Sequence, residues 1–123
     1  PAVVLLGFLV YSAAVSRAMV AEPPDALQIE VVGHQWWWHV HYPMRQPNLS
    51  VSTANEIHIP AGRPVSIHLK SRDVIHSFWV PNLHGKTDLV PGHVNRTWIQ
   101  ADTPGVWRGQ CGEYCGLQHA HMA

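Results

Sequence analysis

The chain has 123 residues, among them ten histidines and six tryptophans, and its eight lysines and arginines balance eight aspartates and glutamates. The formal net charge is therefore zero, and the sequence has no run of lysines and arginines of the kind that binds nucleic acid, so we expect no nucleic-acid partner. The length accommodates one domain of about 100 residues and a short additional segment.

The first segment, residues 2–16, is apolar and is followed by Arg17. It is slightly shorter than the run of about 20 apolar residues that spans a bilayer. Three interpretations are open: a membrane helix, the core of a signal peptide with residues 18–21 as cleavage region, and a buried helix. A soluble domain rarely carries a helix that is apolar on all sides, and a signal peptide has a basic region before its apolar core. We therefore predict a transmembrane helix over residues 1–21.

Residues 22–26 are predicted to form a linker, because Pro23 and Pro24 interrupt helical hydrogen bonding. Beyond this linker, apolar and polar residues alternate in short runs, as they do in β-strands. The runs cover residues 27–32, 56–59, 65–70, 75–80 and 94–100, and turns rich in proline and glycine separate them. This spacing predicts an all-β domain over residues 27–123, a sandwich or a Greek-key barrel.

Three adjacent tryptophans follow the first of these runs. On a strand, Trp36 and Trp38 would lie on one face and Trp37 on the other. For Trp37 and Trp38 we expect packing in the core or in an interface.

Both cysteines lie near the end of the sequence, in a segment with the order Cys111, Cys115, His119 and Met122. Two thiolates, an imidazole and a thioether form a soft ligand set, which suits copper better than magnesium, calcium or manganese. A mononuclear blue-copper site uses one cysteine, so the second is most simply explained if two thiolates bridge two metal ions. Two alternatives stay open: a disulfide, and a zinc site that uses His121 in place of the methionine.

This segment resembles the copper-binding loop of cytochrome c oxidase subunit II, C-x-E-x-C-x-x-x-H-x-x-M. Residues 73–81 resemble a second family segment, D-V-x-H-S-F/W-x-V-P, in which His76 occupies the histidine position. Residues 33–38 resemble the aromatic motif G-H-Q-W-Y-W, and residues 86–92 resemble K-x-D-x-x-P-G. The motifs occur in the family's order and cover most of residues 27–122.

The resemblance implies a cupredoxin fold, preceded by the end of the second helix of a membrane hairpin. It also implies a binuclear copper centre, called CuA, with Cys111 and Cys115 as bridging thiolates. His76 and His119 would be terminal ligands, and Met122 a weak ligand. The backbone carbonyl of Glu113 would be another weak ligand, and its carboxylate would reach a magnesium ion at the boundary with subunit I.

The function implied is that of the electron-entry subunit of a respiratory haem-copper terminal oxidase. Cytochrome c would deliver electrons near Trp36, and the copper centre would pass them to haem in subunit I. There dioxygen would be reduced to water, coupled to proton pumping. The complex would lie in the bacterial or mitochondrial inner membrane, with the copper domain on the periplasmic or intermembrane side.

Other functions stay open: a non-oxidase copper electron carrier and a zinc-stapled β-domain. A quinol-oxidase subunit II is disfavoured, because such subunits lack the copper ligands that are intact here. The sequence departs from the family pattern at Trp37, where tyrosine is common, and at His93, where many members have arginine. It is also not acidic, unlike many domains that dock cytochrome c, which leaves the electron donor open.

Overall fold

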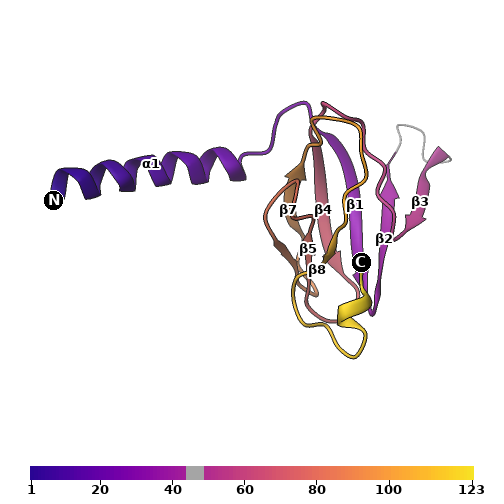
Figure 1. Cartoon of the computed structure of the whole chain (residues 1–123). Coiled ribbons are helices and arrows are strands. Elements are labelled where there is room, and N and C mark those ends of the chain that lie inside the picture. Colours follow the sequence, from indigo (N-terminus) through magenta and orange to yellow (C-terminus); the bar gives the residue numbers. More distant parts are fainter. Residues whose placement is uncertain (44–48) are drawn as a thin grey trace.

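The computed structural model describes residues 1–43 and 49–123. An N-terminal helix, α1 (Ala2–Val20), precedes a β-domain (Figure 1). The strands are β1 (Leu27–His34), β2 (Trp37–Tyr42), β3 (Val51–Ala54), β4 (Val65–Ser71), β5 (His76–Trp79), β6 (Thr87–Leu89), β7 (Asn95–Ile99) and β8 (Gln110–Cys111). A short 3-10 helix, η2 (His119–His121), follows the last strand.

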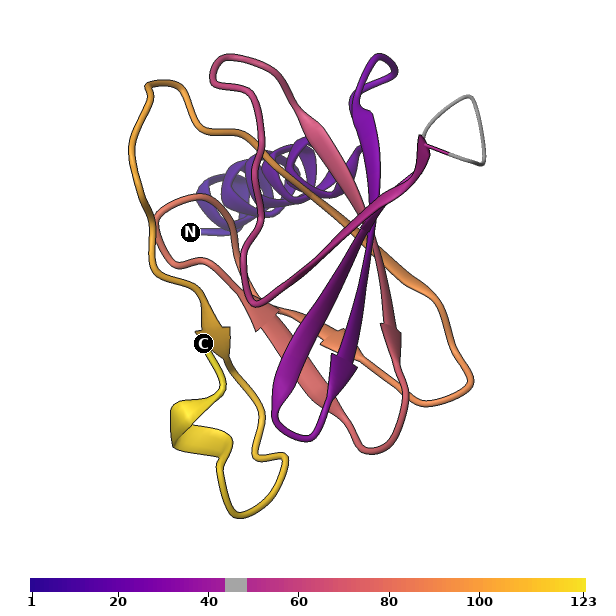
Figure 2. The same cartoon turned by 90° about the vertical axis from the view of Figure 1, so that its right-hand side faces the viewer.

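The strands form two sheets. The first has the order β3-β2-β1-β4-β7, and its β1–β4 pair is parallel whereas the others are antiparallel. The second sheet, β6-β5-β8, is antiparallel throughout. Figure 2 shows the strands from the side, with the last loop at the lower end. The architecture confirms the predicted all-β, cupredoxin-like sandwich with an apolar helix before it.

The core lies between the two sheets. Val31, Ile67 and Leu69 from the first sheet are fully buried, and Phe78 and Leu89 from the second sheet belong to the same hydrophobic cluster. Successive side chains of a strand point to opposite faces of the sheet. In β1, every second residue therefore points into the core, and the residues between them are at least partly exposed. The burial of these side chains fixes the register of the strands that carry the candidate site.

One predicted strand, residues 56–59, is wrong: these residues form a loop, and the strand in this region is β3. Asn55 accounts for the difference. It has a left-handed φ of 60°, and its side-chain oxygen accepts a hydrogen bond from the Trp38 backbone at 2.8 Å, which ends the pairing with β2. Ile57 and Ile59 still pack against the core, so the alternation reported burial but not strand pairing.

The three adjacent tryptophans do not all lie on one strand, in contrast to the prediction. Trp36 lies with Gln35 in the turn between β1 and β2, so it is not a strand residue. His34 pairs with Trp37 directly across this turn. Trp38 is buried in the core as expected, whereas Trp37 is 37% exposed and its ring stacks on that of His34.

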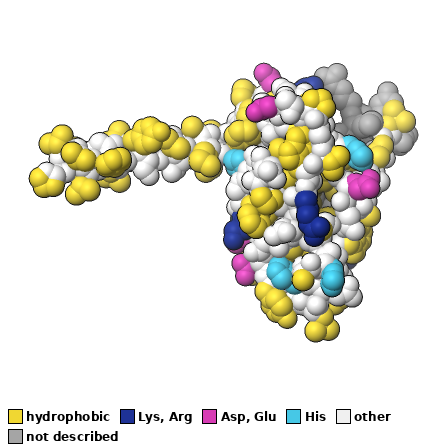
Figure 3. All heavy atoms as spheres, in the orientation of Figure 1, with side chains coloured by type: hydrophobic (Ala, Val, Ile, Leu, Met, Phe, Trp, Pro, Cys, Tyr) yellow, Lys and Arg dark blue, Asp and Glu magenta, His cyan; other side chains and the backbone are white. Residues whose placement is uncertain are grey.

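Helix α1 extends away from the sandwich, and hydrophobic side chains cover it (Figures 1 and 3). None of its residues is buried, which argues against the interpretation as a buried helix. Its 19 residues have a mean hydropathy of 1.9, long and apolar enough to cross a membrane by length and composition. A signal sequence has the same properties, so the transmembrane assignment stays a prediction. Its last turn contacts the sandwich, since the Trp98 indole donates to the carbonyl of Met19 at 2.9 Å.

Candidate metal centre

The loop that follows β8 lies at the end of the sandwich away from α1 (Figure 1). Strand β8 pairs with β5, with Cys111 opposite Phe78, and this pairing brings the loop beside His76. The loop closes on itself, because the Cys111 backbone N–H donates to the carbonyl of Met122 at 2.9 Å. The Gly112 N–H donates to the carbonyl of Ser77 at 2.8 Å and holds the loop to β5.

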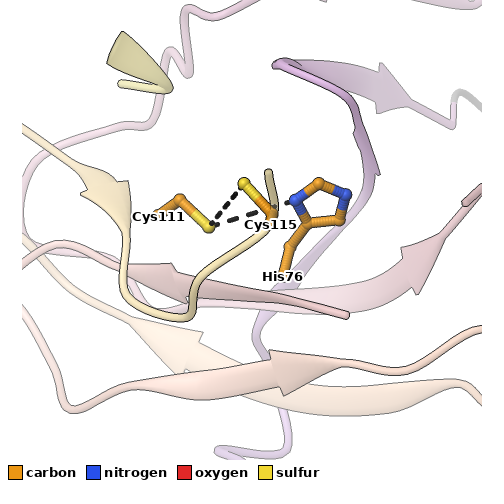
Figure 4. A group of neighbouring side chains, drawn as sticks. All are labelled: His76, Cys111 and Cys115. Atoms are coloured by element: carbon orange, nitrogen blue, oxygen red, sulfur yellow. Dashed lines mark hydrogen bonds between the residues drawn. The ribbon is translucent and has the colours of Figure 1, made fainter. Parts of the chain in front are cut away.

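His76, Cys111 and Cys115 point toward one another (Figure 4). All three are buried, and the ligand atom that each offers lies within 4.8 Å of the other two. Cys111 Sγ lies 4.0 Å from His76 Nδ1 and 3.8 Å from Cys115 Sγ. A disulfide requires a sulfur–sulfur distance of about 2.05 Å, so the two cysteines are free and the disulfide alternative is not realised.

The other predicted ligands surround this cluster. Cys115 Sγ lies 3.6 Å from His119 Nδ1 and 3.8 Å from Met122 Sδ. Cys111 Sγ lies 3.1 Å from the carbonyl oxygen of Glu113, whose side chain is exposed. All the residues that the sequence analysis singled out as ligands therefore converge on the two sulfurs. His121, the additional ligand of the zinc alternative, is exposed.

Asp73 orients the imidazole of His76. Its Oδ1 lies 2.7 Å from His76 Nε2, which leaves Nδ1 directed toward Cys111. A carboxylate on the outer nitrogen fixes the ring orientation of a metal-binding histidine and raises its basicity. Burial lowers the pKa of His76, but the hydrogen bonds and charges of Cys111 and Asp73 outweigh it and hold that pKa above 6.5.

The two thiols differ in acidity. Burial opposes ionisation of Cys111, but hydrogen bonds from His76 and from the backbone outweigh it and lower the pKa of Cys111 to about 6. Burial and the neighbouring Cys111 charge raise the pKa of Cys115 to about 12. Because the thiolate is the form that binds metal, the hydrogen bonds around Cys111 favour its metal-binding form.

Sequence reasoning missed the contacts made by the β1–β2 turn. A Cβ atom on Gly33 would lie 2.8 Å from Cδ2 of His76, so only glycine fits where β1 passes the ring. Gln35 and Trp36 both donate to the carbonyl of Cys115, at 2.8 and 3.3 Å. The motif at residues 33–38 was the available signal, but its spacing alone does not reveal which backbone atoms these residues contact.

A β-sandwich of one mixed and one antiparallel sheet, with free cysteines, histidines and a methionine at one end, is a cupredoxin-like domain with a candidate metal site. The family model described as "Cytochrome C oxidase subunit II, periplasmic domain" matches residues 44–123. The chain belongs to this family.

Relatives agree with this assignment. The chain is 45% identical to cytochrome c oxidase subunit 2 of Alkalihalophilus pseudofirmus, over 80% of this chain and 28% of that one. It is 37% identical to a probable cytochrome c oxidase subunit 2 of Rickettsia bellii, over 99% of this chain and 52% of that one. The chain thus spans only about a quarter to a half of the length of these relatives.

Solved structures show the same architecture. The periplasmic domain of subunit II of cytochrome oxidase (CoxB) of Bradyrhizobium japonicum superposes with a TM-score of 0.75 at 32% identity, covering 83% of each chain. A chain of a heme-copper terminal oxidase dimer shares the fold, with a TM-score of 0.63 at 21% identity over 98% of this chain and 90% of that chain.

Proposed function

We propose that this chain is the electron-entry part of a cytochrome c oxidase subunit II and that it holds a binuclear copper centre. One observation carries the proposal: two free, buried cysteines with their sulfurs 3.8 Å apart, surrounded by the donors of two histidines, a methionine and a carbonyl. The donor set fits copper, because thiolates satisfy Cu(I), imidazoles tolerate Cu(II) and a thioether or carbonyl serves as a weak further ligand.

Each predicted ligand would have its own role in the copper centre. Cys111 and Cys115 would hold the copper pair as its thiolate ligands, and each sulfur lies near a different histidine. His76 and His119 would be terminal ligands, and Met122 and the Glu113 carbonyl would be weak ones. The exposed carboxylate of Glu113 is free to reach a magnesium ion at the boundary with subunit I, and a hard oxygen ligand suits that ion.

When bound, the copper pair would supply one-electron chemistry, accepting electrons from cytochrome c and donating them to haem in subunit I. Trp36 would be the entry point, since its half-buried indole hydrogen-bonds to the carbonyl of the Cys115 ligand. Reduction of dioxygen and proton pumping would occur in subunit I. Helix α1 would anchor the domain in the bacterial or mitochondrial inner membrane, with residues 22–26 as linker and residues 27–123 on the periplasmic or intermembrane side.

The ligand assignment is tested by loading the whole chain with copper in detergent, followed by metal analysis and electron paramagnetic resonance. We expect a delocalised mixed-valence signal from a copper pair. Cys115→Ser should abolish that signal, because one bridge is lost. His121→Ala is the matched control and should leave it unchanged, whereas loss of binding in that variant would favour the zinc alternative. A mononuclear copper signal in the unaltered chain would contradict the proposal.

The donor is tested by stopped-flow reduction of the copper-loaded chain with cytochrome c at several salt concentrations. With a formal net charge of zero, we expect only a weak dependence of the rate on salt. Trp36→Phe should slow reduction by cytochrome c more than reduction by a small chemical reductant. Absence of reaction at every salt concentration would exclude cytochrome c as the donor.

A further inference from the structure

The turn between β1 and β2 contacts the cysteine loop through one carbonyl group. Gln35 Nε2 donates to the carbonyl oxygen of Cys115 at 2.8 Å, and the Trp36 indole N–H donates to the same oxygen at 3.3 Å. A carbonyl oxygen has two lone pairs, so both can be used. Gln35 lies 80 residues from Cys115 in the sequence, and its contact therefore joins distant parts of the fold.

The backbone of Gln35 contacts the other half of the centre. Its N–H donates to Asp73 Oδ2 at 2.8 Å, and the second oxygen of that carboxylate lies 2.7 Å from Nε2 of His76. Gln35 therefore reaches the Cys115 side of the centre with its side chain and, through Asp73, the His76 side with its main chain.

The loop is shaped to accept this contact. Gly116 has a φ of +125°, and a Cβ atom there would lie 3.0 Å from Gln35 Nε2 and 3.1 Å from Trp36 Nε1. Glycine thus allows the loop to approach the two donors without a side chain between them. The peptide group that follows Cys115 is held on one side by these donors.

We propose that Gln35 is a positioning residue that fixes the Cys115 thiolate relative to His76. This inference rests on the proposed copper centre. The Cys115 carbonyl belongs to a ligand residue, so holding its peptide plane limits where Sγ can point. Partners of this kind around metal ligands typically change metal affinity by about 10–100-fold when they are removed. The Trp36 bond is the longer of the two, so we assign the greater share to Gln35.

The test is Gln35→Leu in the whole chain, which removes the side-chain donor at similar size and keeps the main-chain N–H to Asp73. We expect copper affinity, measured by competition with a Cu(I) chelator, to fall about tenfold or more, and the copper hyperfine coupling to change. Gln118→Leu is the matched control: it lies exposed in the same loop and should change neither quantity. Gln35→Glu keeps the shape but offers only acceptors at neutral pH, and it should behave like Gln35→Leu.

Measurements on the unaltered chain distinguish failure of the positioning role from failure of the proposed copper centre. If that chain forms a mixed-valence copper pair and both Gln35 variants match it in affinity and hyperfine coupling, the positioning role is refuted. If the unaltered chain forms no such pair, the proposed function fails instead. Should Gln35→Leu not fold, the isosteric Gln35→Glu carries the same comparison.

Discussion

Replacing Gly33 by alanine tests whether β1 supports the metal centre. Gly33 is buried on β1 beside the fully buried His76, and a Cβ atom there would lie 2.8 Å from Cδ2 and 3.1 Å from Cγ of the ring. It would also lie 3.3 Å from Cδ2 of Leu89, which is likewise fully buried. The added methyl group therefore has no flexible neighbour to displace.

To reach an ordinary contact of 3.4 Å, the imidazole would have to retreat by about 0.6 Å. Overpacking of this kind typically costs about 1–3 kcal/mol of unfolding free energy. The displacement also moves Nδ1 relative to Cys111, so we expect copper affinity to fall about tenfold or more. Both effects have the same origin and should appear together.

Urea unfolding of the copper-free chain in detergent measures the first effect, and competition with a Cu(I) chelator measures the second. Gly85→Ala is the matched control, because a Cβ atom there would meet nothing within 4 Å. An unchanged unfolding free energy and copper affinity in Gly33→Ala would refute the claim that β1 passes too close to His76 for a side chain.

Two further predictions concern polar groups beside the centre. Burial raises the pKa of Asp73, but hydrogen bonds from His76, Val74 and Gln35 outweigh it and hold that pKa below its ordinary 3.8. The ionised carboxylate thus stabilises the fold above pH 3.8, and this contribution is lost as the pH falls below it. In urea unfolding of the copper-free chain, Asp73→Asn should therefore lower the unfolding free energy at pH 6, where the carboxylate is ionised. An unchanged unfolding free energy at pH 6 would show that the carboxylate does not stabilise the fold. Ser77 Oγ is buried without a hydrogen-bond partner among the described residues. Ser77→Ala should therefore raise the unfolding free energy by about 1 kcal/mol in the same assay. A lower unfolding free energy in this variant would show that the hydroxyl has a partner.

The sequence predicted those parts of the fold in which local pattern and burial coincide. The sequences of β1, β4 and β7 alternate because their apolar side chains pack in the core, and their predicted ranges agree with the structure to within two residues. Residues 56–59 alternate for the same reason but lie beyond Asn55, whose backbone turns the chain away from β2. Periodicity reports which side chains are buried, not which main-chain groups are paired.

For the candidate site too, the sequence predicted some residues and not others. The residue types at His76, Cys111 and Cys115 predicted a site for a soft metal, because thiolates and imidazoles are the ligands that such metals prefer. The contributions of Gly33 and Gln35 were not predictable, because one acts by lacking a side chain and the other by donating to a backbone carbonyl. Neither role depends on a ligand-like side chain, so only coordinates reveal it.

The order of the donors along the chain has a consequence for how the centre is made. His76 belongs to a strand, whereas the remaining donors lie on the loop that begins at Cys111, after every strand of the five-stranded sheet. During synthesis that sheet can therefore assemble before the sulfur donors exist. Binding of metal by the sulfur donors would therefore follow the assembly of the five-stranded sheet.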